Sequence, residues 1–140
     1  MITVDDCKLL KLTKVGDSRG NLTFIESGID VKFEIKRIYY IYDVPSGQCR
    51  GAHAHKNLKQ LMIAISGSFD IIVDDGKNKK AITLNNPAVG LYLPTMIWRE
   101  MNNFLTGSVC LVCASDHYDE KDYIRNYNEF LKRKGVRGWK

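Results

Sequence analysis

The feature of this sequence that most restricts its fold is a series of short apolar runs, each ended by turn-forming residues. The run 35–44 is rich in Ile and Tyr and ends at Pro45 and Gly47, and the run 69–73 ends at Asp74, Asp75 and Gly76, a strong hairpin signal. Further runs cover 22–26, 60–65, 81–84, 90–93, 98–101 and 108–114. Short strands at this spacing predict an all-β sandwich or barrel with antiparallel pairing.

The last part of the chain follows a different period. Tyr123, Tyr127, Phe130 and Leu131 recur at helical spacing, and Gly135 is a natural stop. We therefore expect one amphipathic helix over 119–134, packed on the outside of the barrel. Its aromatic stripe is more typical of core contact than of a ligand site.

Length and targeting signals bound the class of protein. The 140 residues are enough for one domain, 1–140, and too few for two. The first ten residues carry acids and lack the apolar segment of a signal peptide, and no apolar run approaches the ~20 residues of a membrane span. We expect a cytoplasmic protein without disulfides. Cys110 and Cys113 form a C-x-x-C inside a strand, which would point them to opposite faces and favours buried thiols over zinc.

The net charge of +5 fits an anionic partner, which could be nucleic acid, an anionic surface or a phosphorylated small molecule. The positive residues are scattered, apart from a group at the C-terminal end: Lys132, Arg133, Lys134, Arg137 and Lys140. Cations at the end of a helix favour its dipole, so a solvated helix end explains this group better than a binding patch.

Two of the three histidines form a His-Ala-His sequence at His53 and His55. In a strand, residues i and i+2 face the same side, so both imidazoles would enter one pocket if that side is a barrel interior. An unperturbed pKa of about 6.5 suits proton transfer at neutral pH. The spacing alone leaves a catalytic pair and a structural pair equally open. His117 lies outside the pattern and is expected at the surface.

The spacing around the two histidines resembles the first motif of the cupin superfamily of jelly-roll barrels. That motif has the form G-x5-H-x-H, followed by Glu and then Gly. Gly47, His53, His55 and Gly67 match it, and Gln60 stands where the motif has its metal-binding Glu.

The second cupin motif, G-x5-P-x-G-x2-H-x3-N, is matched at Pro94 and Asn103. Ala88 and Met96 replace its glycines, and Arg99 replaces its metal-binding histidine. A guanidinium repels a divalent ion and cannot lose its proton to become a ligand. We therefore expect no metal, which leaves the histidines free for proton transfer.

Several further blocks follow in order along the chain. They are 17–20 (DSRG), 35–40 (IKRIYY), 50–56 (RGAHAHK), 87–92 (PAVGLY), 98–101 (WREM), 114–119 (ASDHYD) and 122–127 (DYIRNY). From residue 17 to about 132 the chain resembles the dTDP-4-oxo-6-deoxy-D-glucose 3,4-ketoisomerases, metal-free WxcM-like cupins that are similar in fold to dTDP-sugar epimerases.

The resemblance implies an isomerase that moves the carbonyl of a dTDP-4-keto-6-deoxy-D-glucose from C4 to C3 through an enediolate, without a cofactor. His53 and His55 would be the acid and base, in an order that is left open. Arg99 would stabilise the enediolate or fix a sugar hydroxyl. The product would enter dTDP-3-amino-3,6-dideoxyhexose synthesis for surface polysaccharide.

The same resemblance indicates substrate-binding residues. Arg19, Arg37, Arg50 and Lys56 are candidates for the diphosphate, because arginine forks match phosphate oxygens. Tyr39 and Tyr92 are candidates for the sugar or thymine site, although core packing explains tyrosines equally well. The full predicted set is Arg19, Arg37, Tyr39, Arg50, Lys56, Gln60, Tyr92 and Arg99.

The family divides by the configuration of the product at C4. Arg after Ser in the first block accompanies the galacto product, and Trp-Arg in the block at 98 accompanies the gluco product. This chain has Arg19 and Arg99, one feature of each, and Arg19 is the more distinctive match. The resemblance therefore favours the galacto product.

The resemblance also implies a homodimer, with no nucleic-acid or membrane partner. The segment 2–12 has an alternating stretch that could add a strand to a partner's sheet. Three other functions stay open: a non-catalytic nucleotide-sugar-binding cupin, a dTDP-sugar 3,5-epimerase and a metal dioxygenase. The epimerase would need an acid on the opposite face of the sugar, and no placed tyrosine or His-Asp pair in the sequence demands it. The replacements at Gln60 and Arg99 count against the dioxygenase.

Overall fold

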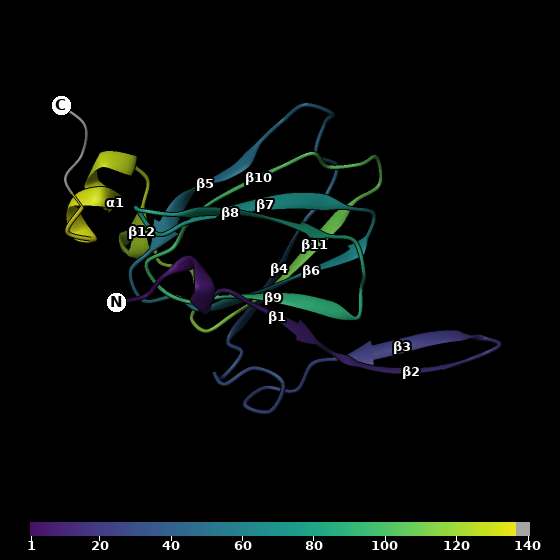
Figure 1. Ribbon diagram of the computed structural model, residues 1–140. Coiled ribbons are helices and arrows are strands. Elements are labelled where there is room, and N and C mark those ends of the chain that lie inside the picture. Colours follow the sequence, from purple (N-terminus) through teal and green to yellow (C-terminus); the bar gives the residue numbers. More distant parts are fainter. Residues whose placement is uncertain (137–140) are drawn as a thin grey trace.

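The computed structural model describes residues 1–136, which fold into two facing antiparallel sheets (Figure 1). Sheet A has the order β1 (Lys8–Lys11), β9 (Val89–Leu93), β6 (Gln60–Ser66), β11 (Val109–Ala114) and β4 (Arg37–Ile41). Sheet B has the order β12 (Tyr123–Ile124), β5 (Arg50–His55), β10 (Trp98–Asn102), β7 (Phe69–Asp74) and β8 (Lys79–Leu84). The predicted antiparallel all-β architecture is confirmed. Arg137 and Lys140 lie outside the described residues.

The main core lies between the two sheets and follows the period of two that strands impose. Phe69, Ile71 and Val73 of β7 point into it from sheet B, and Met62 and Ala64 of β6 point into it from sheet A. Each of these side chains is at most 2 % exposed. Such alternation is what fixes the register of a half-buried strand, because a slip of one residue would turn every apolar side chain outward.

The outer face of sheet A carries a second apolar cluster beneath the loop that joins β3 (Gly20–Phe24) to β4. Leu61 and Ile63 of β6 pack there against Val31 and Phe33 of the loop. Cys113 belongs to this outer cluster, whereas the other half of the predicted C-x-x-C belongs to the core between the sheets. The two thiols therefore face opposite sides and are buried and free, as the strand period predicts.

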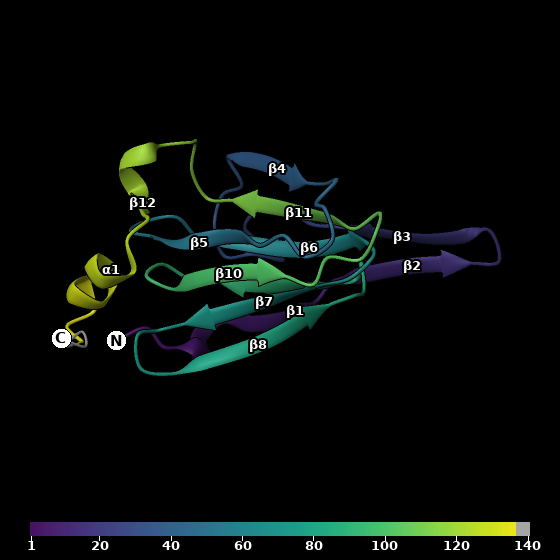
Figure 2. The same ribbon diagram turned by 90° about the horizontal axis from the view of Figure 1, so that it is seen from above.

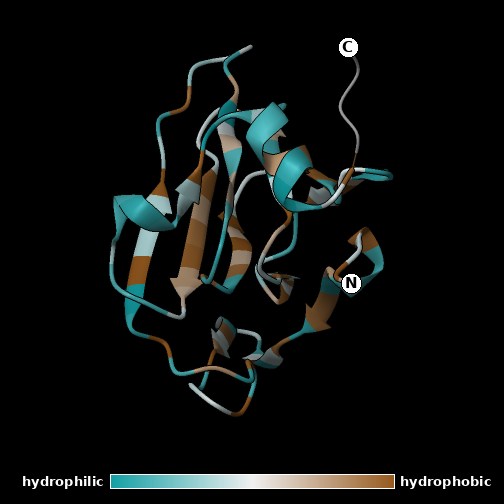
Figure 3. Cartoon of the chain, turned by 90° about the vertical axis from the view of Figure 1, so that its left-hand side faces the viewer, coloured by the Kyte–Doolittle hydropathy of each residue, from teal (hydrophilic) through white to brown (hydrophobic). Residues whose placement is uncertain are grey.

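The segment 119–134 differs from the single helix that its periodicity predicts. A 3₁₀ turn, η2 (Glu120–Asp122), is followed by the short strand β12, and only α1 (Tyr127–Arg133) is α-helical. The helix begins late because β12 is held extended by pairing with the end of β5, after which the Asn126 side chain caps the first turn. α1 closes one end of the sandwich, with its hydrophilic side outward (Figure 3). No helix among residues 1–136 has the length and apolar character needed to cross a membrane.

The ribbon formed by β2 (Thr13–Asp17) and β3 projects away from the sandwich (Figures 1 and 2). Its two strands pair only with each other, while β1 pairs with β9 of the same chain. The apolar side chains of Val15 and Leu22 are each 59 % exposed, and Phe24 is 38 % exposed. A two-stranded ribbon is marginally stable in water by itself, so this one is short of packing partners within the chain.

Candidate active site

A cavity of about 910 Å³ opens between β4, the edge strand of sheet A, and the first residues of β5, which lie beyond the short pairing of β12 with the end of β5. Its walls include Arg37, Tyr39, Arg50, His53, Arg99 and Arg125. Four of these six side chains are arginines. The cavity therefore has the size and the charge to hold an anionic ligand with a ring system.

A β-bulge in β5 sets the direction of His53. On β10, Arg99 lies opposite His53 and Glu100 lies opposite Gly51, which leaves Ala52 without a partner. Gly51 and Ala52 take left-handed φ angles of 90° and 56°. A Cβ atom on Gly51 would lie 3.0 Å from the Arg99 carbonyl oxygen, so the close approach requires glycine. The bulge brings the His53 imidazole and the Arg99 guanidinium to one wall of the cavity.

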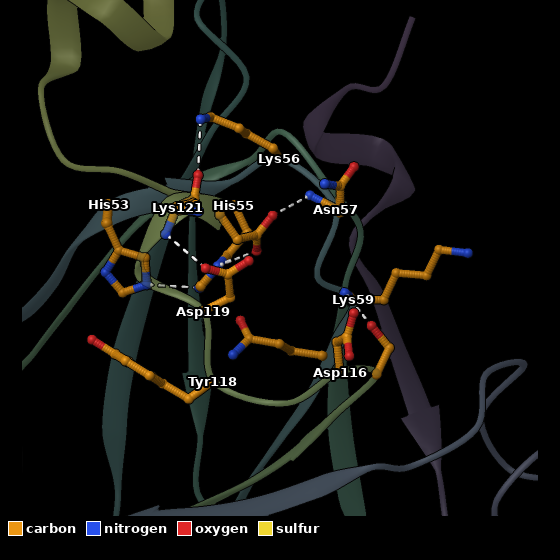
Figure 4. A network of polar contacts seen from close by, with 12 residues as sticks. His53, His55, Lys56, Asn57, Lys59, Asp116, Tyr118, Asp119 and Lys121 are labelled. Carbon is orange, nitrogen blue, oxygen red and sulfur yellow. Dashed lines mark hydrogen bonds and ion pairs between the residues drawn. The ribbon is translucent and has the colours of Figure 1, made fainter.

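Behind His53, two further side chains form a hydrogen-bonded series (Figure 4). The Nε2 atoms of His53 and His55 are 3.1 Å apart, and Nδ1 of His55 lies 2.9 Å from Oδ2 of Asp122. His55 is 1 % exposed and does not line the large cavity. The expectation that both rings enter one pocket therefore holds for His53 alone, with His55 as its inner neighbour.

Both imidazoles are neutral at neutral pH. Burial, reinforced by the Arg99 cation, lowers the pKa of His53 to about 4. Burial and the same cation hold the pKa of His55 well below its ordinary value. A neutral ring has one nitrogen that accepts a proton, so His53 can act as a base without first losing one.

Arg99 is fully buried and only partly satisfied. Its Nη1 donates to Oε1 of Gln60 and its Nε donates to the Ile97 carbonyl at 3.2 Å, but its Nη2 has no partner. No carboxylate of residues 1–136 forms an ion pair with it. A buried cation with a free donor in a cavity wall is suited to an anion that forms or binds there.

Gln60 links Arg99 to the opposite sheet. Its Nε2 donates to the hydroxyl of Tyr39 on β4 at 2.7 Å. Burial raises the pKa of Tyr39, so the phenol stays protonated at neutral pH. Because the hydroxyl oxygen already accepts from Gln60, its own hydrogen is available to the cavity. His53 and Tyr39 thus approach the cavity from the two different sheets.

The remaining predicted binding residues divide into two groups. Arg37 lines the cavity with its guanidinium 5.3 Å from the Tyr39 ring centre, and its buried Nε has no partner. Arg50 is exposed at the cavity mouth. Both are placed to contact a ligand.

Lys56, Tyr92 and Arg19 do not line this cavity. Lys56 donates through Nζ to the Lys121 carbonyl at 2.9 Å. Tyr92 points to the outer face of sheet A, with its ring 6.4 Å from that of Phe33. Arg19 lies at the turn of the protruding ribbon, in an exposed ion pair with its neighbour Asp17.

Comparisons with known proteins bear on this geometry. The family model for FdtA, described as WxcM-like, C-terminal, matches residues 5–135. The chain belongs to this family. A TDP-4-oxo-6-deoxy-alpha-D-glucose-3,4-oxoisomerase from Aneurinibacillus thermoaerophilus is 47 % identical over 89 % of this chain and 90 % of the relative.

Solved structures agree with the FdtA-family assignment. The WlaRB TDP-quinovose 3,4-ketoisomerase from Campylobacter jejuni is 54 % identical, with a TM-score of 0.87 over 91 % of this chain and 98 % of the other. QdtA, a sugar 3,4-ketoisomerase from Thermoanaerobacterium thermosaccharolyticum solved in complex with TDP, is 44 % identical, with a TM-score of 0.93 over 95 % and 97 %. A histidine variant of QdtA was also solved with TDP-4-keto-6-deoxyglucose.

The structure of this FdtA-family chain adds site residues that sequence reasoning missed. Asp122 supports His55, and Tyr118, Tyr123 and Arg125 line the cavity. Arg125 forms an ion pair with Glu120 and lies 4.3 Å from the centre of the Tyr123 ring. All four lie within 114–127, which carries part of the family resemblance. The signal was present, but the helical interpretation of 119–134 concealed it for Asp122, Tyr123 and Arg125.

Proposed function

We propose that this chain is a dTDP-4-keto-6-deoxy-D-glucose 3,4-ketoisomerase. The curated 3,4-oxoisomerase supports the reaction, and the QdtA complex with TDP-4-keto-6-deoxyglucose supports the substrate. The observation that carries the proposal is the pair formed by neutral His53 and the unpaired Arg99 on one wall of the cavity. A base next to an isolated cation is suited to proton abstraction beside a carbonyl.

The reaction follows from these groups. The C4 ketone makes the C3 hydrogen acidic, and His53 takes that hydrogen as a proton. The resulting enediolate carries negative charge, which the Arg99 guanidinium stabilises in a site of low dielectric. His53 then donates a proton to C4, and exchange of the imidazolium with solvent before this step lets solvent hydrogen enter at C4. The hydroxyl proton leaves O3 and one is gained at O4, so the carbonyl ends at C3 with no net oxidation.

Tyr39 is placed to move the hydroxyl proton. Tyr39 lines the cavity from sheet A, while His53 lines it from sheet B. A protonated phenol can donate to O4 as it takes the proton of O3, which separates oxygen-to-oxygen transfer from the carbon-to-carbon transfer at His53. Arg37, Arg50 and Arg125 are then left for the diphosphate.

The C4 configuration of the product is the finer choice. Arg19 favours the galacto product. Arg99, together with the 54 % identity to a TDP-quinovose ketoisomerase, favours the gluco product. The galacto prediction therefore rests on one exposed residue of the ribbon, and the proton coupling constants of the product at C4 decide it.

A homodimer would account for the protruding ribbon. The exposed apolar side chains of β2 and β3 need a surface to cover. The outer side of β4 exposes Ile38 and Tyr40, and Tyr42 just after the strand is also exposed. If a second copy packs its ribbon across β4 of the first copy, two-fold symmetry buries the ribbon and the β4 surface of both copies. Arg19 can then meet substrate only in the cavity of the partner.

The dimer has a direct test. Leu22→Asp should shift the mass measured by light scattering from that of two chains to that of one, whereas Asn21→Asp, an exposed neighbour on the same strand, should not. A wild-type mass of one chain would contradict the dimer. The cytoplasmic location stays a prediction.

The deciding experiment incubates the protein with dTDP-4-keto-6-deoxyglucose in deuterated buffer and follows the product by proton NMR. We expect a 3-keto product with deuterium at C4, abolished in His53→Asn and strongly reduced in Tyr39→Phe. Tyr92→Phe is the matched control and should leave turnover unchanged, because that ring lies outside the cavity. Activity should also survive dialysis against a chelator.

Two outcomes would replace the proposal. Exchange at C3 and C5 with the ketone still at C4 would indicate a 3,5-epimerase. Binding of dTDP-sugar by folded wild type with neither exchange nor conversion would indicate the non-catalytic binding cupin.

A further inference from the structure

The hydrogen-bonded series behind the cavity has a fixed direction. An ionised carboxylate has only acceptor atoms. Asp122 uses both carboxylate oxygens. Its Oδ1 accepts from the backbone N–H of Asn57 at 2.7 Å, and its Oδ2 faces Nδ1 of His55 at 2.9 Å. Nδ1 of His55 must therefore carry the hydrogen. In a neutral ring, Nε2 of His55 is then an acceptor.

The pairing of one donor with one acceptor also fixes the tautomer of His53. Nε2 of His53 lies 3.1 Å from the acceptor Nε2 of His55, so His53 is the donor in this contact. Nδ1 of His53 is then its only nitrogen with a free lone pair. We propose that Asp122 is a positioning residue that acts through His55 to set the tautomer of the catalytic base, His53. This inference rests on the proposed ketoisomerase function.

The arrangement also explains how a cation can form at His53. The proton taken from substrate makes an imidazolium near Arg99, and that arrangement is unfavourable. The Nε2–H of the imidazolium points to His55, whose own N–H is held by the Asp122 carboxylate. The rings polarise toward this negative charge, and the Gly51 carbonyl also favours the protonated form of His53.

An isosteric change separates orientation from packing. Asp122→Asn keeps the shape of the side chain. Its amide oxygen must stay on the Asn57 N–H, because the amide NH₂ cannot accept there. The NH₂ then faces Nδ1 of His55 and makes that atom an acceptor. His55 becomes a donor at Nε2, and His53 is left with its hydrogen on Nδ1. That nitrogen can then no longer accept the proton of the substrate.

Asp119→Asn is the matched control. Asp119 and Asp122 both border a small cavity of about 50 Å³ behind His55, which is large enough for a water molecule. Asp119 caps η2 by accepting from the Lys121 amide at 3.0 Å, and Asn caps as well as Asp. The variant makes the same change of charge in the same place without touching either ring.

The test combines nitrogen-15 NMR of the histidine rings with single-turnover kinetics and dTDP binding. In wild type, His55 should carry its hydrogen on Nδ1 and His53 on Nε2, and both should invert in Asp122→Asn. Turnover should fall at least 100-fold, while dTDP affinity changes less than about twofold; an analogous change in a protease triad costs about 10⁴. Asp119→Asn should match wild type in all three measurements.

Several results would overturn the inference. One is a wild-type His53 with its hydrogen on Nδ1. Another is an Asp122→Asn protein within threefold of wild-type turnover, and a third is equal loss in both variants. If Asp122→Asn does not fold, the wild-type tautomers alone still decide. If wild type folds with the expected tautomers but converts no substrate, the proposed function fails and the hydrogen-bond assignment stands.

Discussion

Replacing Gln60 by Leu should destabilise the fold because Nη1 of Arg99 loses its hydrogen-bond acceptor. Both side chains are 0 % exposed, and Gln60 accepts the hydrogen bond of Nη1. Leu fills a similar volume, so the main loss is a hydrogen bond to a buried charge, about 1.5–3 kcal/mol. Tyr39 also loses its donor, but this residue lines the cavity, so we expect water to replace Gln60 there. We expect the free energy of unfolding to fall by about 2–3 kcal/mol and Tm by roughly 10 °C.

Gln60→Glu is the informative counterpart. The introduced carboxylate accepts from the Arg99 guanidinium and supplies the counter-charge that residues 1–136 lack, while the desolvation of Arg99 is already part of the native state. Stability in urea should equal or exceed that of wild type, but turnover should fall at least tenfold. The cation that serves the enediolate is neutralised, and Tyr39 now donates to the carboxylate. A Gln60→Leu protein within about 0.5 kcal/mol of wild type, or a Gln60→Glu protein less stable than Gln60→Leu, would refute this reasoning.

Three further predictions concern stability. The unfolding free energy should fall as pH drops from about 6.5 to 4, because the histidines bind protons in the unfolded chain and the buried native rings do not. For His53 the loss amounts to at most about 3 kcal/mol. Urea titrations of His53→Gln should show a smaller fall. Gly51→Ala should lower Tm by more than Gly47→Ala. Both residues have left-handed φ angles, but only at Gly51 would the new Cβ meet a backbone oxygen. Equal shifts of Tm would contradict this explanation. Tyr127→Phe should lower stability in thermal melts by about 1–2 kcal/mol with turnover unchanged, because it removes a 2.6 Å hydrogen bond to Asp74; an unchanged melt would show that water replaces it.

Local patterns predicted most of the fold. The eight apolar runs all contain strands, because side chains that alternate between a core and an outer face leave a period of two in the sequence. The ribbon between 13 and 24 was predicted only in its second half, because β2 has no buried face and hence no apolar alternation. The segment 119–126 was assigned to a helix because Tyr123 and Tyr127 are four apart, and the pairing of Tyr123 with His55 is a long-range contact that no local window contains.

The site was predictable where it repeats a spacing and not where it depends on tertiary contact. The cupin spacing placed Gln60 and Arg99 with the histidines, and the structure brings the first two into contact. Asp122 is 67 residues from His55 in the chain, so nothing near either residue marks them as partners. Tyr92 belongs to a matching block, yet its position in β9 turns it to the outer face of sheet A.

The bulge in β5 changes how positions along this strand are counted. Strict alternation would place Arg50 and His53, three residues apart, on opposite faces. Because Ala52 has no partner, the two residues are separated by two steps of the ladder, at Met101 and Arg99, and both reach the cavity. Deleting Ala52 would leave an even separation and keep both side chains inward. If the bulge is kept, inserting one residue beside it adds a third ladder step and turns Arg50 toward solvent while His53 stays opposite Arg99, so that the anion-binding wall and the base are separated by a change in length alone.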